Sequence, residues 1–165
     1  MAKPVVGILM GSDSDLPVME ETTKILKQFG VPFEITVSSA HRSPARTSEY
    51  TRTAAQRGLK VIIAGAGSAA HLAGVIAAET TLPVIGIPID SSPLKGMDAL
   101  LATVQMPGGI PVATMAIGKA GARNAGVFAV QILAVSNKRL RDKLAAYKVE
   151  LAKGVEEKAK KLARS

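Results

Sequence analysis

His41 and Arg42 are the pair of side chains in this 165-residue chain best suited to catalysis. An imidazole takes up and releases a proton near neutral pH, as general acid–base catalysis requires. A guanidinium presents a fixed fork of donors that matches a phosphate or a carboxylate. A capping or surface histidine and a solvated arginine are the alternatives. The position of residues 39–42 between a strand and a helix start favours catalysis beside an anion.

The segment 11–15, GSDSD, is suited to binding a phosphorylated ligand. Its small polar residues open a helix, whose free N–H groups and dipole favour an anion. The hydroxyls of Ser12 and Ser14 can donate to a phosphate, whereas an ionised Asp15 only accepts hydrogen bonds. We therefore expect Asp15 to cap the helix or to accept from a ribose hydroxyl or an amine. An ordinary helix cap explains the segment about equally well.

The segment 65–74, GAGSAAHLAG, is a third candidate. Gly65 and Gly67 permit a close backbone approach or a positive φ, and Ser68 at a helix start can cap or contact a ligand. We expect His71 at most to line a site, because a buried or interface position suits it as well. Two separate histidines without clustered carboxylates predict no metal site.

The segment 105–111, QMPGGIP, is predicted to form a turn. Its Pro-Gly-Gly sequence fixes the chain direction and exposes backbone N–H groups. Gln105 and Met106 could form a wall for a flat ligand, but a plain turn fits the spacing as well.

The elements that position these segments alternate between short apolar runs and helical stretches, which predicts a parallel α/β domain. Strands are expected at 5–10, 33–38, 60–64, 83–87 and 111–117. Helices are expected from the GSDSD segment to Phe29, at 44–58, after the third strand, and at 120–134. The result is a three-layer, flavodoxin-like open five-stranded sheet with helices on both faces. Ligands bind at the carboxyl ends of such strands, and the long connection 88–109 is expected to be a functional loop.

Composition indicates one domain, residues 1–165, with a core at 1–136 and a charged helical extension at 137–165. The extension carries +6 of the net charge of +8. Its apolar residues recur at helical spacing, which favours packing on protein over binding nucleic acid or membrane. The chain has no cysteine, which excludes disulfides, thiolate zinc sites and cysteine nucleophiles. No signal peptide or transmembrane run is evident, so a cytoplasmic location is expected.

Taken together, these segments resemble the N5-carboxyaminoimidazole ribonucleotide mutase family (class I). The matching stretches are GSDSDLPVM at 11–19, SAHRSP at 39–44, GAGSAAHLAG at 65–74, LPVIGIP at 82–88, and VQMPGGIPVATMAIG at 104–118. The resemblance spans about residues 4–135 in order and spacing.

The resemblance implies an intramolecular transferase of de novo purine biosynthesis. Its substrate is a small nucleotide, N5-carboxyaminoimidazole ribonucleotide, whose carboxylate moves to a ring carbon without metal, cofactor or ATP. CO2 is released inside the site and recaptured, and a histidine at the position of His41 shuttles the protons. The implied substrate-binding residues are Ser12, Ser14, Asp15, Ser39, Arg42, Ser68 and His71.

The resemblance also implies partners and leaves alternatives open. It implies a homo-octamer with sites at subunit contacts, and a separate ATP-dependent synthetase upstream. Residues 65–70 and the Pro-Gly-Gly turn are expected to line the CO2 pocket, although Ser68 replaces a common Gly and Ala73 a usual Pro. The alternatives are an aminoimidazole ribonucleotide carboxylase that uses CO2 directly, and a non-catalytic module that binds a phosphorylated metabolite. A nucleic-acid-binding tail is a weaker third.

Overall fold

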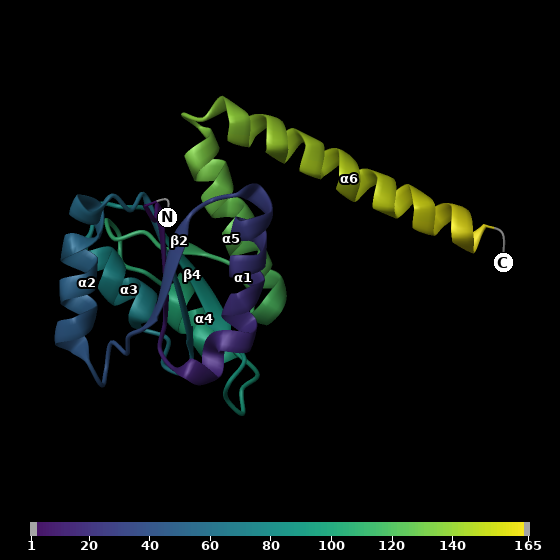
Figure 1. The fold of residues 1–165 in the computed structure, drawn as a ribbon. Coiled ribbons are helices and arrows are strands. Elements are labelled where there is room, and N and C mark those ends of the chain that lie inside the picture. The colour runs from purple at the N-terminus through teal and green to yellow at the C-terminus, as the bar shows by residue number, and fades with distance from the viewer. Residues whose placement is uncertain (1–2, 164–165) are drawn as a thin grey trace.

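Five parallel strands form one sheet in the order β2-β1-β3-β4-β5 in the computed structural model, which describes residues 3–163 (Figure 1). The strands are β1 Val6–Met10, β2 Phe33–Val37, β3 Val61–Gly67, β4 Val84–Ile89 and β5 Ala113–Thr114. The chain leaves β1 for β2 on one side and then crosses to β3 on the other. The direction of winding therefore reverses beside β1, where flavodoxin-like sheets bind their ligands.

Helices cover both faces of the sheet and make three layers, as the alternating pattern predicts (Figure 1). On one face lie α1 and α5, and on the other α2, α3 and α4. The helices are α1 Leu16–Phe29, α2 Pro44–Arg57, α3 Leu72–Glu79, α4 Met97–Val104, α5 Gly118–Ala134 and α6 Lys138–Leu162. Central strands read as continuous apolar runs because both of their faces are buried.

The local stop and start signals in the sequence act as expected. α1 ends at Gly30, whose φ of 70° is the left-handed conformation that glycine adopts most readily. α2 begins at Pro44, directly after Ser43 at the N-cap position, although the Ser43 hydroxyl donates to the Ser39 carbonyl and makes no capping hydrogen bond. These signals fix the loop between β2 and α2, which carries His41.

Three segments differ from the sequence-based expectation. β5 contains only two residues rather than 111–117, since only Ala113 and Thr114 pair with β4. β3 continues through Gly65 to Gly67, because β4 offers pairing partners there. The connection 88–109 is not one long loop, because it contains α4, whose Ala99 and Thr103 are buried.

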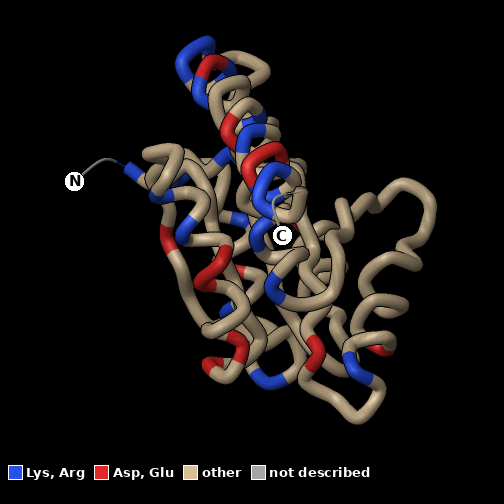
Figure 2. The backbone as a smooth tube through the Cα atoms, turned by 90° about the vertical axis from the view of Figure 1, so that its right-hand side faces the viewer, with Lys and Arg blue, Asp and Glu red and all other residues tan. Residues whose placement is uncertain are grey.

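α6 is the expected long C-terminal helix, and residues 164–165 of the predicted extension lie outside the described residues. Its first turns pack on the body through Leu140, Leu144 and Tyr147, the last in edge contact with Phe29. Beyond them α6 projects from the body (Figure 1) and carries charges of both signs (Figure 2). Within residues 3–163, no helix is long and apolar enough to span a membrane.

Candidate functional site

The loops after β1, β2 and β3 meet at the carboxyl edge of the sheet and enclose a cavity of about 280 Å³. This is the edge to which the sequence analysis assigned the site. Its lining residues are Gly11, Ser12, Ser14, Asp15, Ser39, Ala40, His41, Arg42, Ala66, Gly67, Ala69, Leu72 and Ser91. A larger cavity of about 590 Å³ lies at the amino edge, between the body and α6. Its lining contains no histidine or carboxylate, so it lacks groups that exchange protons near neutral pH.

The loop after β1 folds into a 3-10 turn, Asp13–Asp15, that is closed by its own side chains. Ser12 accepts a hydrogen bond from the Ser14 N–H at 3.3 Å, and Asp15 accepts one from the Ser12 N–H at 3.1 Å. Asp15 is only 4% exposed. Burial raises the pKa of its carboxyl, an effect that the Ser12 N–H only partly offsets. Asp15 therefore makes the expected capping hydrogen bond, while burial disfavours the ionised form of its carboxyl.

The two histidines of the chain are in contact. His41 Nε2 lies 2.8 Å from His71 Nδ1, and the rings meet edge to face with centroids 4.9 Å apart. Both side chains are exposed. Because His41 follows β2 and His71 precedes α3, the strand order brings them together on either side of β1. The positions of the two histidines in the sequence did not predict this contact.

Arg42 joins the loop after β2 to the loop after β1. Its Nη2 donates to the Gly11 carbonyl at 3.1 Å, and its backbone N–H donates to the Ser39 hydroxyl at 3.2 Å. Arg42 also borders a second hollow of about 340 Å³ beside the first, which Ser12 and Ser39 share. The guanidinium therefore stands between two cavities at a strand edge, in a position to hold an anion.

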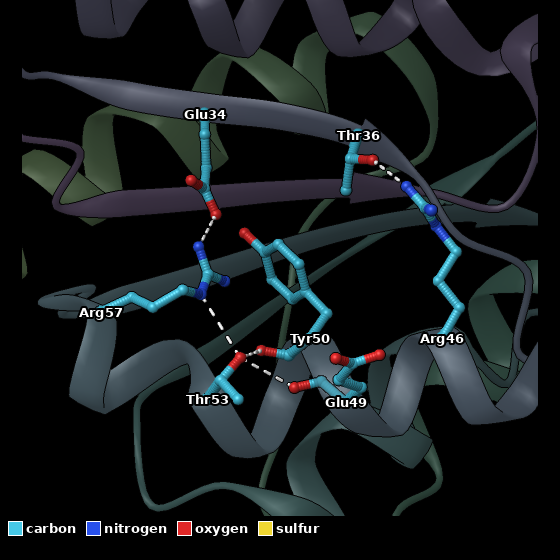
Figure 3. A network of polar contacts seen from close by, with 7 residues as sticks. All are labelled: Glu34, Thr36, Arg46, Glu49, Tyr50, Thr53 and Arg57. Carbon is cyan, nitrogen blue, oxygen red and sulfur yellow. Dashed lines mark hydrogen bonds and ion pairs between the residues drawn. The ribbon is translucent and has the colours of Figure 1, made fainter.

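A polar network ties β2 to α2, the two elements that flank His41 (Figure 3). Arg57 forms an ion pair with Glu34 of β2 and stacks over the Tyr50 ring, 4.5 Å from its centroid. Burial raises the pKa of the Glu34 carboxyl, but the hydrogen bond and charge of Arg57 and the nearby Tyr50 hydroxyl outweigh it and leave the pKa lowered. Nearer the site, Arg46 donates to the Thr36 hydroxyl and the Val37 carbonyl. These bonds hold both ends of the loop.

The loop after β3 departs from expectation at Ser68. Its φ of 53° is left-handed, which strains a side chain with a Cβ. Ser68 neither caps α3 nor lines the cavity, so its role as a substrate contact stays a prediction. The cavity wall instead includes Gly67 and Ser91, and sequence reasoning assigned no role to Ser91.

The turn at 105–111 does not line this cavity. Met106 lies over Gly74 in α3, where an added Cβ would come within 3.1 Å of its sulfur. Gly108 and Gly109 face open space. The expected contribution of the Pro-Gly-Gly turn to a CO2 pocket is therefore not made within one chain.

Acidic residues, histidines and cysteines do not gather in groups of three or more that could hold a metal ion, as far as residues 3–163 are concerned.

A second polar cluster lies away from the cavity, where Glu21 of α1 contacts Lys24 at 2.6 Å and Arg123 of α5 at 2.8 Å. Hydrogen bonds from Lys24 and then Arg123 lower the pKa of Glu21 to about 2.

Known proteins resemble the chain along nearly its whole length. A family model described as AIR carboxylase matches residues 5–154. The N5-carboxyaminoimidazole ribonucleotide mutase of Pyrococcus horikoshii is 58% identical, over 97% of this chain and 89% of that protein. The phosphoribosylaminoimidazole carboxylase of Candida glabrata is 52% identical, over 97% of this chain but 28% of that protein. The crystal structure of Treponema denticola PurE aligns with a TM-score of 0.84 and 28% identity, over 93% and 95% of the two chains.

Proposed function

The chain belongs to the AIR carboxylase family, and on this premise we propose that it isomerises N5-carboxyaminoimidazole ribonucleotide in de novo purine biosynthesis. The product is 4-carboxy-5-aminoimidazole ribonucleotide. The observation that carries the proposal is one cavity that combines His41, Arg42, Asp15 and a wall of small residues. A relative that is 58% identical and named for this mutase supports it.

In the proposed reaction, His41 moves one proton from one position of the substrate to another. The carbamate C–N bond breaks with its electron pair going to nitrogen, which takes a proton from the protonated His41 imidazole. CO2 and aminoimidazole ribonucleotide result. The ring carbon then attacks CO2 with the electron pair of the enamine-like ring. Neutral His41 removes the proton from that carbon, which restores the aromatic ring and the protonated imidazole.

The other groups of the cavity bind the nucleotide in this proposal. Arg42 faces the phosphate or the carboxylate with the guanidinium donors that Gly11 leaves free. Asp15 accepts from a ribose hydroxyl with the carboxylate oxygen that Ser12 does not occupy. The hydroxyls of Ser12, Ser14 and Ser39 complete the polar side. His71 is not among the lining residues of the cavity and instead orients the His41 ring through their 2.8 Å contact.

An absorbance assay with both candidate substrates tests the proposal. The purified protein with a chelator is expected to convert the carboxyamino substrate without ATP. Faster conversion of aminoimidazole ribonucleotide with CO2 would favour the direct carboxylase, which the name of the Candida glabrata relative supports. Binding without product from either substrate would favour the non-catalytic module.

Replacing His41 by Asn tests the proton shuttle. Turnover is expected to fall about 10²- to 10⁴-fold, the usual contribution of a positioned acid–base group. Nucleotide binding is expected to persist, because the Arg42 and Asp15 contacts do not involve His41. His71→Asn serves as the matched control and is expected to lose less. Turnover within a few-fold of the original chain in His41→Asn would show that another group moves the proton.

We further propose a homo-octamer, acting in the cytoplasm, with sites at subunit contacts. Capture of CO2 requires a site closed to water, yet both histidines are exposed in one chain. Four apolar residues in α4 and just before it are each 47% to 64% exposed: Leu94, Met97, Leu101 and Val104. Such a stripe marks an association surface. A single-subunit mass in solution with full activity would contradict this.

A further inference from the structure

Ser91 reaches the catalytic cavity from a loop that the proposed mechanism does not use. It follows β4 and lines the same cavity as His41. The other lining residues come from the loops after β1, β2 and β3 and from the start of α3. Ser91 therefore brings the loop after β4 to the cavity as well.

The hydroxyl of Ser91 occupies space that Gly67 leaves vacant. A Cβ at Gly67 would lie 1.7 Å from Ser91 Oγ and 3.1 Å from the Ile89 carbonyl oxygen. No side chain at position 67 is compatible with this placement of the hydroxyl. Two small apolar residues, Ala66 and Ala69, line the same cavity as Ser91.

Ser91 is exposed, and within the described residues 3–163 its hydroxyl makes no hydrogen bond to the protein. Hydroxyls nearby already have a protein partner: the Ser14 hydroxyl donates to the Ser12 hydroxyl at 2.9 Å. Ser92 donates to Asp98 Oδ1 at 2.9 Å and accepts from the Leu94 N–H. Ser91 therefore offers a donor and two acceptor positions to whatever occupies the cavity.

We propose that Ser91 donates its hydroxyl hydrogen bond to an oxygen of the migrating carboxylate, an inference that rests on the proposed function. The migrating group is an anionic carboxylate when bonded and neutral CO2 when free. The alanines Ala66 and Ala69 can contact neutral CO2. One hydroxyl donor can hydrogen-bond to an oxygen of the carboxylate and of CO2, without binding one of them too tightly to react. The donor holds CO2 beside the ring carbon until the C–C bond forms. Ser91 thus prevents loss of CO2 from the site.

The experiment follows the carboxyl carbon. Substrate labelled with ¹³C in the carboxylate is converted in buffer equilibrated with unlabelled CO2, and label in the product is measured by mass spectrometry. The original chain is expected to retain the label. Ser91→Ala is expected to lose turnover about tenfold, which is the effect of one neutral hydrogen bond, and to exchange most of its label with the solution.

Ser92→Ala is the matched control, because it loosens the same loop but removes no hydroxyl from the cavity. It is expected to retain the label. Full retention in Ser91→Ala, or equal exchange in both variants, would overturn the inference. Absence of product with the original chain would instead refute the proposed function.

Discussion

Two carboxylates near the start of the chain, Asp15 and Glu21, are almost equally buried and yet titrate in opposite directions. Asp15 is 4% exposed and Glu21 8%. Burial raises the pKa of Asp15, while Lys24 and Arg123 lower that of Glu21 to about 2. Two causes differ. Desolvation dominates at Asp15, which accepts only the Ser12 N–H at hydrogen-bonding distance, whereas two cations contact Glu21 and outweigh its desolvation.

This contrast separates the scaffold from the site. Glu21 and Arg123 clamp α1 to α5, whose packing covers one face of the sheet, so their charges serve stability. Asp15 faces the cavity with its charge largely uncompensated. Uncompensated buried charge is typical of functional positions, because the missing partner is supplied by the ligand. Three substitutions test this division between scaffold and site.

Asp15→Asn is expected to have the largest effect, and on activity. The uncharged amide still accepts from the Ser12 N–H but binds a ribose hydroxyl more weakly, so kcat/KM is expected to fall about 10- to 100-fold. The pKa of Asp15 is raised, so its ionised form opposes folding above that pKa, and the opposition disappears as pH falls through it. The variant is therefore expected to melt at the same or a higher temperature at pH 7.

Thermal melts and steady-state kinetics on one preparation check this prediction. A lower melting temperature in Asp15→Asn, with unchanged kinetic constants, would show that Asp15 stabilises the fold as Glu21 does and does not bind the substrate.

Glu21→Gln is expected to show the reverse behaviour. Its lowered pKa means that the ion pairs stabilise the fold fully above the ordinary value of 4.5 and that this stability is lost as pH falls through about 2. The variant is expected to melt a few degrees lower at pH 7, and the difference from the original chain is expected to vanish near pH 2. Kinetic constants are expected to stay the same.

The exposed neighbour Glu20 provides a control, since Glu20→Gln removes the same charge from the same helix without touching Arg123. A pH-independent loss of stability in Glu21→Gln would show that packing, rather than charge, holds the two helices.

Ser68→Gly is expected to have the smallest effect. Glycine adopts the φ of 53° without the steric cost that a Cβ brings, but it loses more entropy on folding. The free energy of unfolding is expected to rise by up to about 1 kcal/mol. Ser68→Ala keeps the strain and removes only the hydroxyl. A higher KM in both variants would establish Ser68 as a substrate contact, while a change in Ser68→Gly alone would assign its role to the backbone.

The sequence predicted what depends on local signals. Apolar runs located the strands, Gly30 marked the end of α1, and Pro44 marked the start of α2. The open parallel sheet with helices on both faces followed because parallel connections restrict the topology. His41, Arg42, Asp15 and the serines of the first two loops then came together as expected, since all follow neighbouring strands.

What the sequence did not predict depends on contacts between distant loops. The spacing of His41 and His71 does not indicate that their rings touch, because that depends on how α3 is seated on the sheet. Gly67 suggested a close approach, but not that Ser91 makes it. α4 carries its own helical periodicity in residues 97–104, a signal obscured by treating 88–109 as one loop.

The part of α6 that projects from the body can report on whether the chain has assembled with a partner (Figure 1). Among residues 148–161, the helix itself and pairs such as Lys153 with Glu150, which are worth little in water, protect the amides from solvent exchange. In a lone chain this stretch would exchange its amide hydrogens with deuterium long before the sheet does. Any partner that covers Leu151 and Val155 would slow that exchange. The deuterium uptake of one helix would then measure how much of the protein is assembled.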